Sequence, residues 1–147
     1  MCDITKSGVE TMNIGELLPQ KYPFLMVDRL LEVKTGVYAK TCKCITRNEP
    51  WAVGHFGEQV IFPGVLMIEN MAQTAALIYA GGEGEKKEEL YLACVDNVKF
   101  SRVAEPGQKI ETVAKQVFSF GDMIKAECII TEGEQKIAQG TLVLCVR

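Results

Sequence analysis

The longest apolar stretch of the chain covers residues 65–80, where Leu, Met and Ala predominate and no residue breaks a helix. Pro63 and Gly64 precede it, and proline suits a first helical turn because the N–H groups there lack intrahelical partners. At 100° per residue, both faces of this stretch are largely apolar. The pattern therefore predicts one long helix that is buried on nearly all sides and ends near Ala80, before Gly81 and Gly82.

Apolar runs divided by turn residues predict a series of extended segments around this helix. In chain order they cover residues 24–34, 37–46, 90–100, 109–120, 123–131 and 136–146. The fifth alternates most cleanly, with one face formed by Ile124, Ala126, Cys128 and Ile130. A short helix over residues 14–18, capped by Asn13, is predicted before them. One long helix wrapped by antiparallel strands is an α+β arrangement.

Length and composition indicate a single soluble, globular domain. The chain has 147 residues, of which 48% are hydrophobic and 24% charged. Residues 1–11 are polar and show no periodicity, so we expect a disordered N-terminal tail there and the domain over residues 12–147. The net charge of −3 argues against nucleic-acid binding, which requires a basic patch.

Other classes of protein are disfavoured by single features. Glu69, Asn70 and Gln73 interrupt the longest apolar segment, which argues against a membrane span. The six cysteines form no C-x-x-C pair and the chain has one histidine, so a metal site has little support. We expect reduced cysteines, no secretory signal at the chain start and a cytoplasmic location.

Glu69 is the first candidate for chemistry, because it is the only normally charged side chain between Glu58 and Glu83. Burial of a carboxylate is costly unless it is paired, and burial raises its pKa. Such a group can hold a proton near neutral pH and act as an acid. The alternative is a structural carboxylate that Gln73, one turn further on, or a backbone N–H satisfies.

His55 is the second candidate. Taken alone, a histidine in a loop is more often a packed or surface group than a catalyst. Three features combine here: a glycine-flanked imidazole, a helix N-terminus able to stabilise an oxyanion, and a carboxyl group in apolar surroundings. Together they form three parts of an acid–base site.

The sequence motifs in this region resemble those of a known enzyme family. Gly54-His55-Phe56, Pro63-Gly64-Val65-Leu66, Glu69 and Ala72-Gln73 are similar in type and spacing to the active-site motif of FabZ-type β-hydroxyacyl-acyl carrier protein dehydratases. Residues 18–29 resemble the N-terminal signature of the same family, and the resemblance runs from about Met12 to the C-terminus. It implies a single hotdog domain, an antiparallel sheet wrapped around one central helix.

The chain departs from the family pattern at three positions. Gln20 stands where the family usually has His, and Gly57 and Val60 stand where it has prolines. Two fixed φ angles are thereby lost, which predicts a looser loop between His55 and the helix.

The resemblance implies the reversible dehydration of (3R)-hydroxyacyl-acyl carrier protein to the trans-2-enoyl thioester in fatty acid elongation. In this scheme His55 is the base for the C2 proton and protonated Glu69 is the acid for the hydroxyl. Backbone N–H groups of Gly64 and Val65 would bind the thioester oxygen, and Gln73 would orient the carboxyl group. No metal or other cofactor is expected.

The resemblance also implies partners. In the family, the His and Glu of one site come from two subunits of a homodimer, commonly assembled into a trimer of dimers. The acyl tunnel would be lined by Phe62, Leu66, Tyr91 and Phe100, for which core packing is the alternative. Lys99 and Arg102 are candidates for docking the acidic carrier protein, with ordinary surface charge as the alternative.

Two other functions compete with dehydration. A hotdog thioesterase would hydrolyse the acyl thioester, but such enzymes tend to lack the paired His and Glu motifs, and the isomerising dehydratases typically have Asp where Glu69 stands. A non-catalytic partner of the acyl carrier protein is motivated only by the altered loop at Gly57 and Val60. Retention of His55 and Glu69 counts against it.

Overall fold

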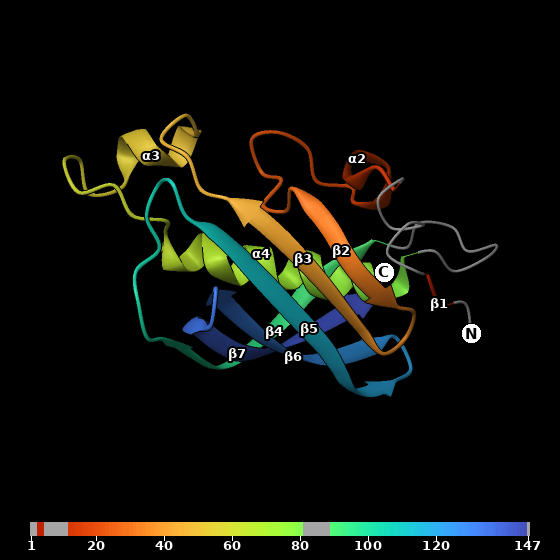
Figure 1. The fold of residues 1–147 in the computed structure, drawn as a ribbon. Coiled ribbons are helices and arrows are strands. Elements are labelled where there is room, and N and C mark those ends of the chain that lie inside the picture. Colours follow the sequence, from red (N-terminus) through yellow and green to blue (C-terminus); the bar gives the residue numbers. More distant parts are fainter. Residues whose placement is uncertain (1–2, 5–11, 81–88, 147) are drawn as a thin grey trace.

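A computed structural model describes residues 3–4, 12–80 and 89–146 (Figure 1). The elements in chain order are β1 (Asp3–Ile4), α2 (Ile14–Leu17), β2 (Arg29–Lys34), β3 (Tyr38–Cys44), α3 (Pro50–Gly54), α4 (Gly64–Ala76), the 3₁₀ helix η1 (Leu77–Tyr79), β4 (Leu90–Phe100), β5 (Lys109–Phe120), β6 (Met123–Glu132) and β7 (Gln135–Val146).

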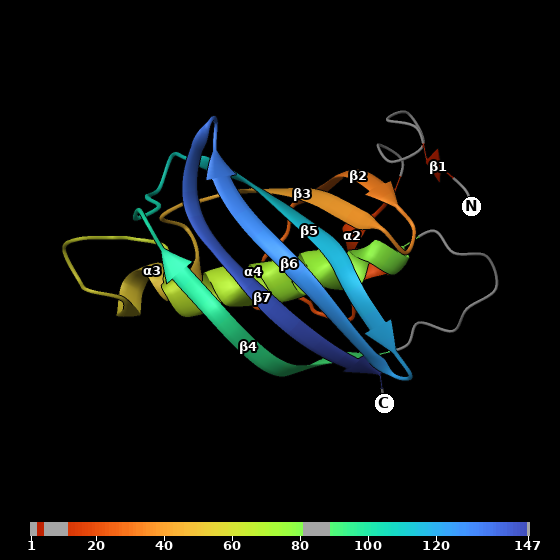
Figure 2. The same cartoon turned by 90° about the horizontal axis from the view of Figure 1, so that it is seen from below.

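The strands form one antiparallel sheet in the order β1-β2-β3-β5-β6-β7-β4. The sheet curves around α4, which lies along its concave side (Figure 1). In the view from below, β4 to β7 lie across the helix (Figure 2). The expected α+β class and hotdog arrangement are therefore confirmed. In this sheet β4 is an edge strand, whereas β6 lies between two neighbours.

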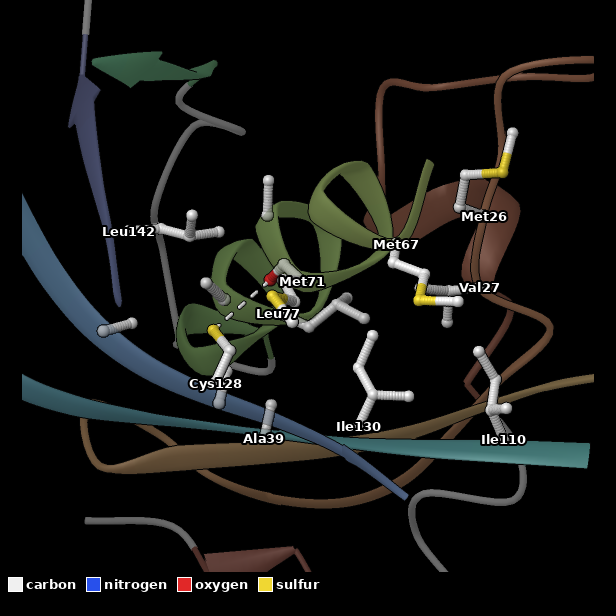
Figure 3. Close-up of a cluster of buried hydrophobic side chains, with 14 of the residues drawn as sticks. Met26, Val27, Ala39, Met67, Met71, Leu77, Ile110, Cys128, Ile130 and Leu142 are labelled. Carbon is white, nitrogen blue, oxygen red and sulfur yellow. Dashed lines mark hydrogen bonds between the residues drawn. The ribbon is translucent and has the colours of Figure 1, made fainter. Parts of the chain in front are cut away.

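The core lies between α4 and the concave face of the sheet. The alternation predicted for β6 is confirmed, because Ile124, Ala126, Cys128 and Ile130 are buried while the residues between them are exposed. Figure 3 shows side chains of α4 and of the strands meeting in this space, among them Met71 and Cys128. Burial raises the pKa of the Cys128 thiol to about 12, so this thiol is an inert core group.

Buried polar side chains fix α4 relative to its surroundings. Asn70 donates to the Met26 carbonyl oxygen at 2.7 Å and accepts from the Thr112 hydroxyl at 2.6 Å. Thr74 and Thr41 share a hydrogen bond of 2.8 Å. Buried polar groups are costly unless they are paired, so these contacts favour one position of the helix against β3 and β5.

Several elements differ from the sequence-based prediction. Helix α4 ends at Ala76 and continues as the 3₁₀ turn Leu77–Tyr79, and the short helix α3 was not predicted. Residues 24–28 are not a strand, because Phe24 and Met26 form hydrogen bonds with side chains of α4 instead of a neighbouring strand. Residues Asp3–Ile4 pair with β2, and the rest of the predicted tail, like Gly81, lies outside the described residues.

A search of the described helices finds none with both the length and the apolar character needed to cross a membrane.

Candidate active site

Helix α3 positions His55. Pro50 occupies its first turn, where a missing N–H costs nothing, and His55 follows directly as the C-cap residue. The ring of Trp51 packs edge-on against Phe62 at 5.3 Å. The short helix is further held by an ion pair at its N-terminal end, because Lys43 of β3 lies 2.6 Å from the Glu49 carboxylate.

The histidine side chain is half-buried and has a defined hydrogen-bond partner. Its Nδ1 lies 3.0 Å from the carbonyl oxygen of Ile61. A carbonyl oxygen can only accept, so Nδ1 carries the hydrogen in the neutral ring. Nε2 therefore has the free lone pair, and it is the nitrogen able to remove a proton.

The loop after His55 has an unusual backbone. Phe56 and Gly57 both lie in the left-handed region, with φ of +56° and +55°. Proline is restricted to φ near −65°, so the proline of the family pattern does not fit the Gly57 conformation seen here. The looser loop expected from the loss of this proline stays a prediction.

Glu69 projects from the middle of α4 and is half-buried. Burial raises its pKa, and a hydrogen bond from Gln73 opposes that rise. The Gln73 amide nitrogen lies 2.9 Å from the Glu69 carboxyl oxygen Oε1. The carboxyl group thus has the apolar setting and the Gln73 contact that the sequence predicts, a setting that suits a proton donor.

The N-terminus of α4 brings backbone donors beside an aromatic ring. Gly64 and Val65 hold its first two positions. The carbonyl oxygen of Pro63 accepts hydrogen bonds from the N–H groups of Leu66 and Met67, so the N–H groups of Gly64 and Val65 have no acceptor within the helix. A Cβ built on Gly64 would lie 3.1 Å from the ring of Phe100. This ring therefore covers the helix start closely, and the absence of a side chain at Gly64 permits the approach.

The predicted tunnel residues divide into two groups. Phe62 is 1% exposed and belongs to the core cluster, and Leu66 packs partly against that cluster. Tyr91 and Phe100 are exposed residues of β4, and the Tyr91 hydroxyl donates to Glu89 at 2.7 Å. A tunnel between them remains a prediction.

The two predicted docking residues lie on either side of Phe100 in the sequence. Lys99 precedes Phe100, whose ring touches Gly64, and Arg102 follows it after the end of β4. Both side chains are exposed.

Within one chain, the described residues include no hydrogen bond or ion pair that joins His55 to Glu69. In the same described part, no three His, Cys, Asp or Glu side chains are grouped to hold a metal ion.

Sequence reasoning missed two sets of contacts around the site. One is the Lys43–Glu49 ion pair, in which the Lys43 side chain is only 3% exposed. A lysine flanked by two cysteines in an apolar strand, six residues before a glutamate, was the available signal. The other is the pair of backbone groups of Phe24 and Met26 that bind Gln73, for which the sequence carries no local signal.

Structural comparison supports the fold. The dehydratase heterocomplex ApeI:P from Xenorhabdus doucetiae has a chain that matches with a TM-score of 0.78 and 15% identity, over 92% of this chain and 91% of that one. A thioesterase superfamily member from Thermus thermophilus matches with a TM-score of 0.63 and 19% identity, over 78% and 83% of the two chains. At these identities the likeness shows the fold alone.

Sequence comparison is more specific. A protein named 3-hydroxyacyl-[acyl-carrier-protein] dehydratase FabZ from Rhizobium etli is 40% identical over 124 residues, 84% of this chain and 80% of the relative. Its namesake from Wolbachia pipientis is 37% identical over 136 residues, 88% and 91% of the two chains. The model of the FabA-like domain matches residues 18–141, which include both candidate groups. This chain therefore belongs to the FabA-like domain family, and its sequence is similar to those of FabZ-type dehydratases.

Proposed function

We propose that this chain dehydrates (3R)-hydroxyacyl-acyl carrier protein thioesters to trans-2-enoyl thioesters in fatty acid biosynthesis. The observation that carries this proposal is the state of Glu69, a half-buried carboxyl group whose pKa is raised by burial, in a chain 40% identical to a named dehydratase. Burial favours the protonated form of this carboxyl group, and a protonated carboxyl group is the acid that loss of water requires.

Each catalytic group has one task. Nε2 of His55 removes the proton from C2, while backbone N–H groups of Gly64 and Val65 stabilise the negative charge on the thioester oxygen. Glu69 donates its proton to the C3 hydroxyl, which leaves as water. The C2–C3 double bond forms as the C3–O bond breaks. Return of the proton from His55 to Glu69 through solvent restores the starting state.

The active form in this proposal is a homodimer that pairs His55 of one subunit with Glu69 of the other. Support comes from β4, an edge strand on which all residues but Leu90 and Val98 are exposed in the single chain. Such an edge carries unpaired backbone groups that a second strand can bind. Large apolar side chains near the site are also exposed, among them Val53 at 85% and Val65 at 73%. Three such dimers would assemble into a hexamer, as the family resemblance implies.

The acyl chain would lie along Leu66, Tyr91 and Phe100, with Phe62 as part of the core wall behind them. Lys99 and Arg102 would attract the acidic carrier protein, since both are exposed beside the strand end that meets the helix start. The reaction would take place in the cytoplasm, in keeping with the unpaired state of all five described cysteines.

The direct test measures interconversion of crotonyl-acyl carrier protein and 3-hydroxybutyryl-acyl carrier protein. We expect activity in the wild type and a loss of roughly 10²-fold or more in His55→Ala and in Glu69→Ala, the scale of a lost acid or base. Circular dichroism would verify that each variant is folded. Release of free thiol without enoyl product would instead identify a thioesterase and refute the proposal.

A further inference from the structure

Gln73 is a buried amide whose orientation is dictated by the backbone of a distant segment. Its side chain is 1% exposed. The N–H of Met26 donates to its Oε1 at 2.8 Å, and its Nε2 donates to the carbonyl oxygen of Phe24 at 2.8 Å. An amide N–H can only donate and a carbonyl can only accept, so a flipped amide would face two like partners. Only one orientation satisfies both contacts.

This orientation leaves one hydrogen of Nε2 for Glu69. Oε1 of Glu69 lies 2.9 Å from Nε2, and Gln73 must be the donor in this contact. In a protonated carboxyl group the carbonyl oxygen is a better acceptor than the hydroxyl oxygen. The hydrogen bond from Gln73 therefore favours Oε1 as the carbonyl and places the proton on Oε2.

The segment that dictates this arrangement is itself firmly held. The carbonyl oxygen of Met26 accepts from Asn70 at 2.7 Å, and the side chain of Met26 is buried. Two residues further on, Asp28 donates its N–H to Cys42 at 2.9 Å and accepts from the N–H of Cys44 at 2.6 Å. These contacts fix the segment to both α4 and β3.

We propose that the backbone of Phe24 and Met26 acts through Gln73 as a positioning device, which keeps the acidic proton of Glu69 on Oε2. The inference rests on the proposed function, in which Glu69 is the acid. Its consequence is that the proton always lies on the oxygen that Gln73 leaves free, so that one defined O–H group is presented for the substrate hydroxyl. Gln73 is thus a positioning residue and touches no reacting atom.

The first test is spectroscopic and does not depend on activity. Protein labelled with ¹³C at the glutamate carboxyl groups is compared with the same protein carrying Glu69→Gln, and the infrared difference isolates the C=O stretch of protonated Glu69. A hydrogen bond to the carbonyl oxygen lowers this frequency. We expect the band to move to higher frequency in Gln73→Met and to keep its position in Thr74→Val. Thr74→Val is the matched control, because it removes a buried hydrogen bond of the same helix without touching Glu69. An unmoved band in Gln73→Met would overturn the inference.

The second test is the pH dependence of kcat/KM with 3-hydroxybutyryl-acyl carrier protein, the direction in which Glu69 is the acid. The hydrogen bond from Gln73 lowers the pKa of Glu69, so its removal raises that pKa and moves the alkaline limb of the profile to higher pH. Within the described chain, burial and the Gln73 hydrogen bond are the only causes that change the pKa of Glu69. In the proposed dimer, the partner's His55 would face the same carboxyl group. We also expect kcat to fall by about tenfold to a hundredfold, the scale of a misplaced catalytic group. A limb that stays in place would contradict the inference.

Gln73→Glu guards against a folding defect in Gln73→Met. A protonated glutamate at this position accepts from Met26 and donates to Phe24, so both backbone contacts survive, but it has no second hydrogen for Glu69. We expect a melting temperature closer to that of the wild type and a similar loss in kcat. Wild-type kcat in this variant would overturn the inference. Complete inactivity of the wild type would refute the proposed function, while the infrared comparison would still decide the position of the proton.

Discussion

In both Glu69 and His55, one hydrogen bond to a neighbour determines which atom of the side chain is left for catalysis in the proposed mechanism. The Ile61 carbonyl oxygen makes Nδ1 of His55 a donor and leaves Nε2 as the nitrogen able to accept a proton. Gln73 donates to one oxygen of Glu69 and leaves the other free. Each group therefore has one available atom, and that atom has the polarity that its proposed role requires.

The raised pKa of Glu69 has a consequence for stability. Because burial raises this pKa above the ordinary value of 4.5, the folded chain binds the proton more tightly than the unfolded chain. The group's contribution to the free energy of unfolding is then greatest below pH 4.5 and declines as pH rises through the raised pKa. We expect the stability of Glu69→Gln relative to the wild type to increase from acidic to neutral pH, measured by urea unfolding at fixed protein concentration.

The exposed carboxylate Glu134, in the turn between β6 and β7, supplies the control. Glu134→Gln removes the same charge without the burial. A stability difference for Glu69→Gln that stays constant with pH, or that follows the same course as Glu134→Gln, would show that burial of Glu69 does not raise its pKa.

At the scale of elements, the first turn of α4 both packs against β4 and carries the backbone donors of the proposed site. Phe100 of β4 rests on the backbone of Gly64, so the strand and the helix N-terminus are in direct contact. The same turn offers the backbone donors proposed for the thioester oxygen. Any side chain at position 64 must therefore displace either the ring or the donors.

Gly64→Ala is expected to destabilise the fold by about 1–3 kcal/mol, the usual cost of overpacking. Alanine in an open helix would normally stabilise it by roughly 0.5–1 kcal/mol relative to glycine, so the sign of the effect is diagnostic. Urea unfolding of Gly64→Ala, Phe100→Leu and the double variant measures the coupling. A double variant less destabilised than the sum of the single variants would confirm the contact, whereas additive effects would contradict it.

The sequence predicted most of the elements because their patterns are local. The bounds of β4 and β5 match the predicted segments, and β6 follows the predicted alternation. Helix α3 was missed because five residues are too few for a helical period to appear. Residues 24–28 have strand-like composition, but Phe24 and Met26 form hydrogen bonds with Gln73 and Asn70, which are more than 40 residues away.

At the scale of the whole molecule, one chain holds both proposed catalytic groups, and no hydrogen bond or ion pair among its described residues joins them. The edge strand β4 is exposed along most of its length, and several large apolar residues around the site face solvent. A second copy that pairs along β4 would cover this edge and extend the sheet. The proposed dimer thus accounts for the exposed edge and for the absence of a hydrogen bond between His55 and Glu69 within the described part of one chain.

Mixing inactive variants tests the shared site. In a heterodimer of His55→Ala and Glu69→Ala, one site keeps both catalytic groups and the other loses both. Random exchange of subunits in a twofold dimer should therefore restore about a quarter of wild-type activity. Glu69→Ala mixed with the double variant His55→Ala/Glu69→Ala is the control and should stay inactive. No recovery in the first mixture, with exchange verified by mass spectrometry, would place both groups of a site in one chain.

The sequence by itself determined the α+β class, the order of most elements and the identity of the acid and base candidates. These properties depend on neighbouring residues, through hydrophobic period, turn residues and short motifs. Tertiary structure alone decided which nitrogen of His55 is free, how Gln73 is turned and where Phe100 rests. Those features are set by Ile61, by the backbone of Phe24 and Met26, and by Gly64. Hydrogen bonds and packing have a direction in space, and no pattern along the chain specifies it.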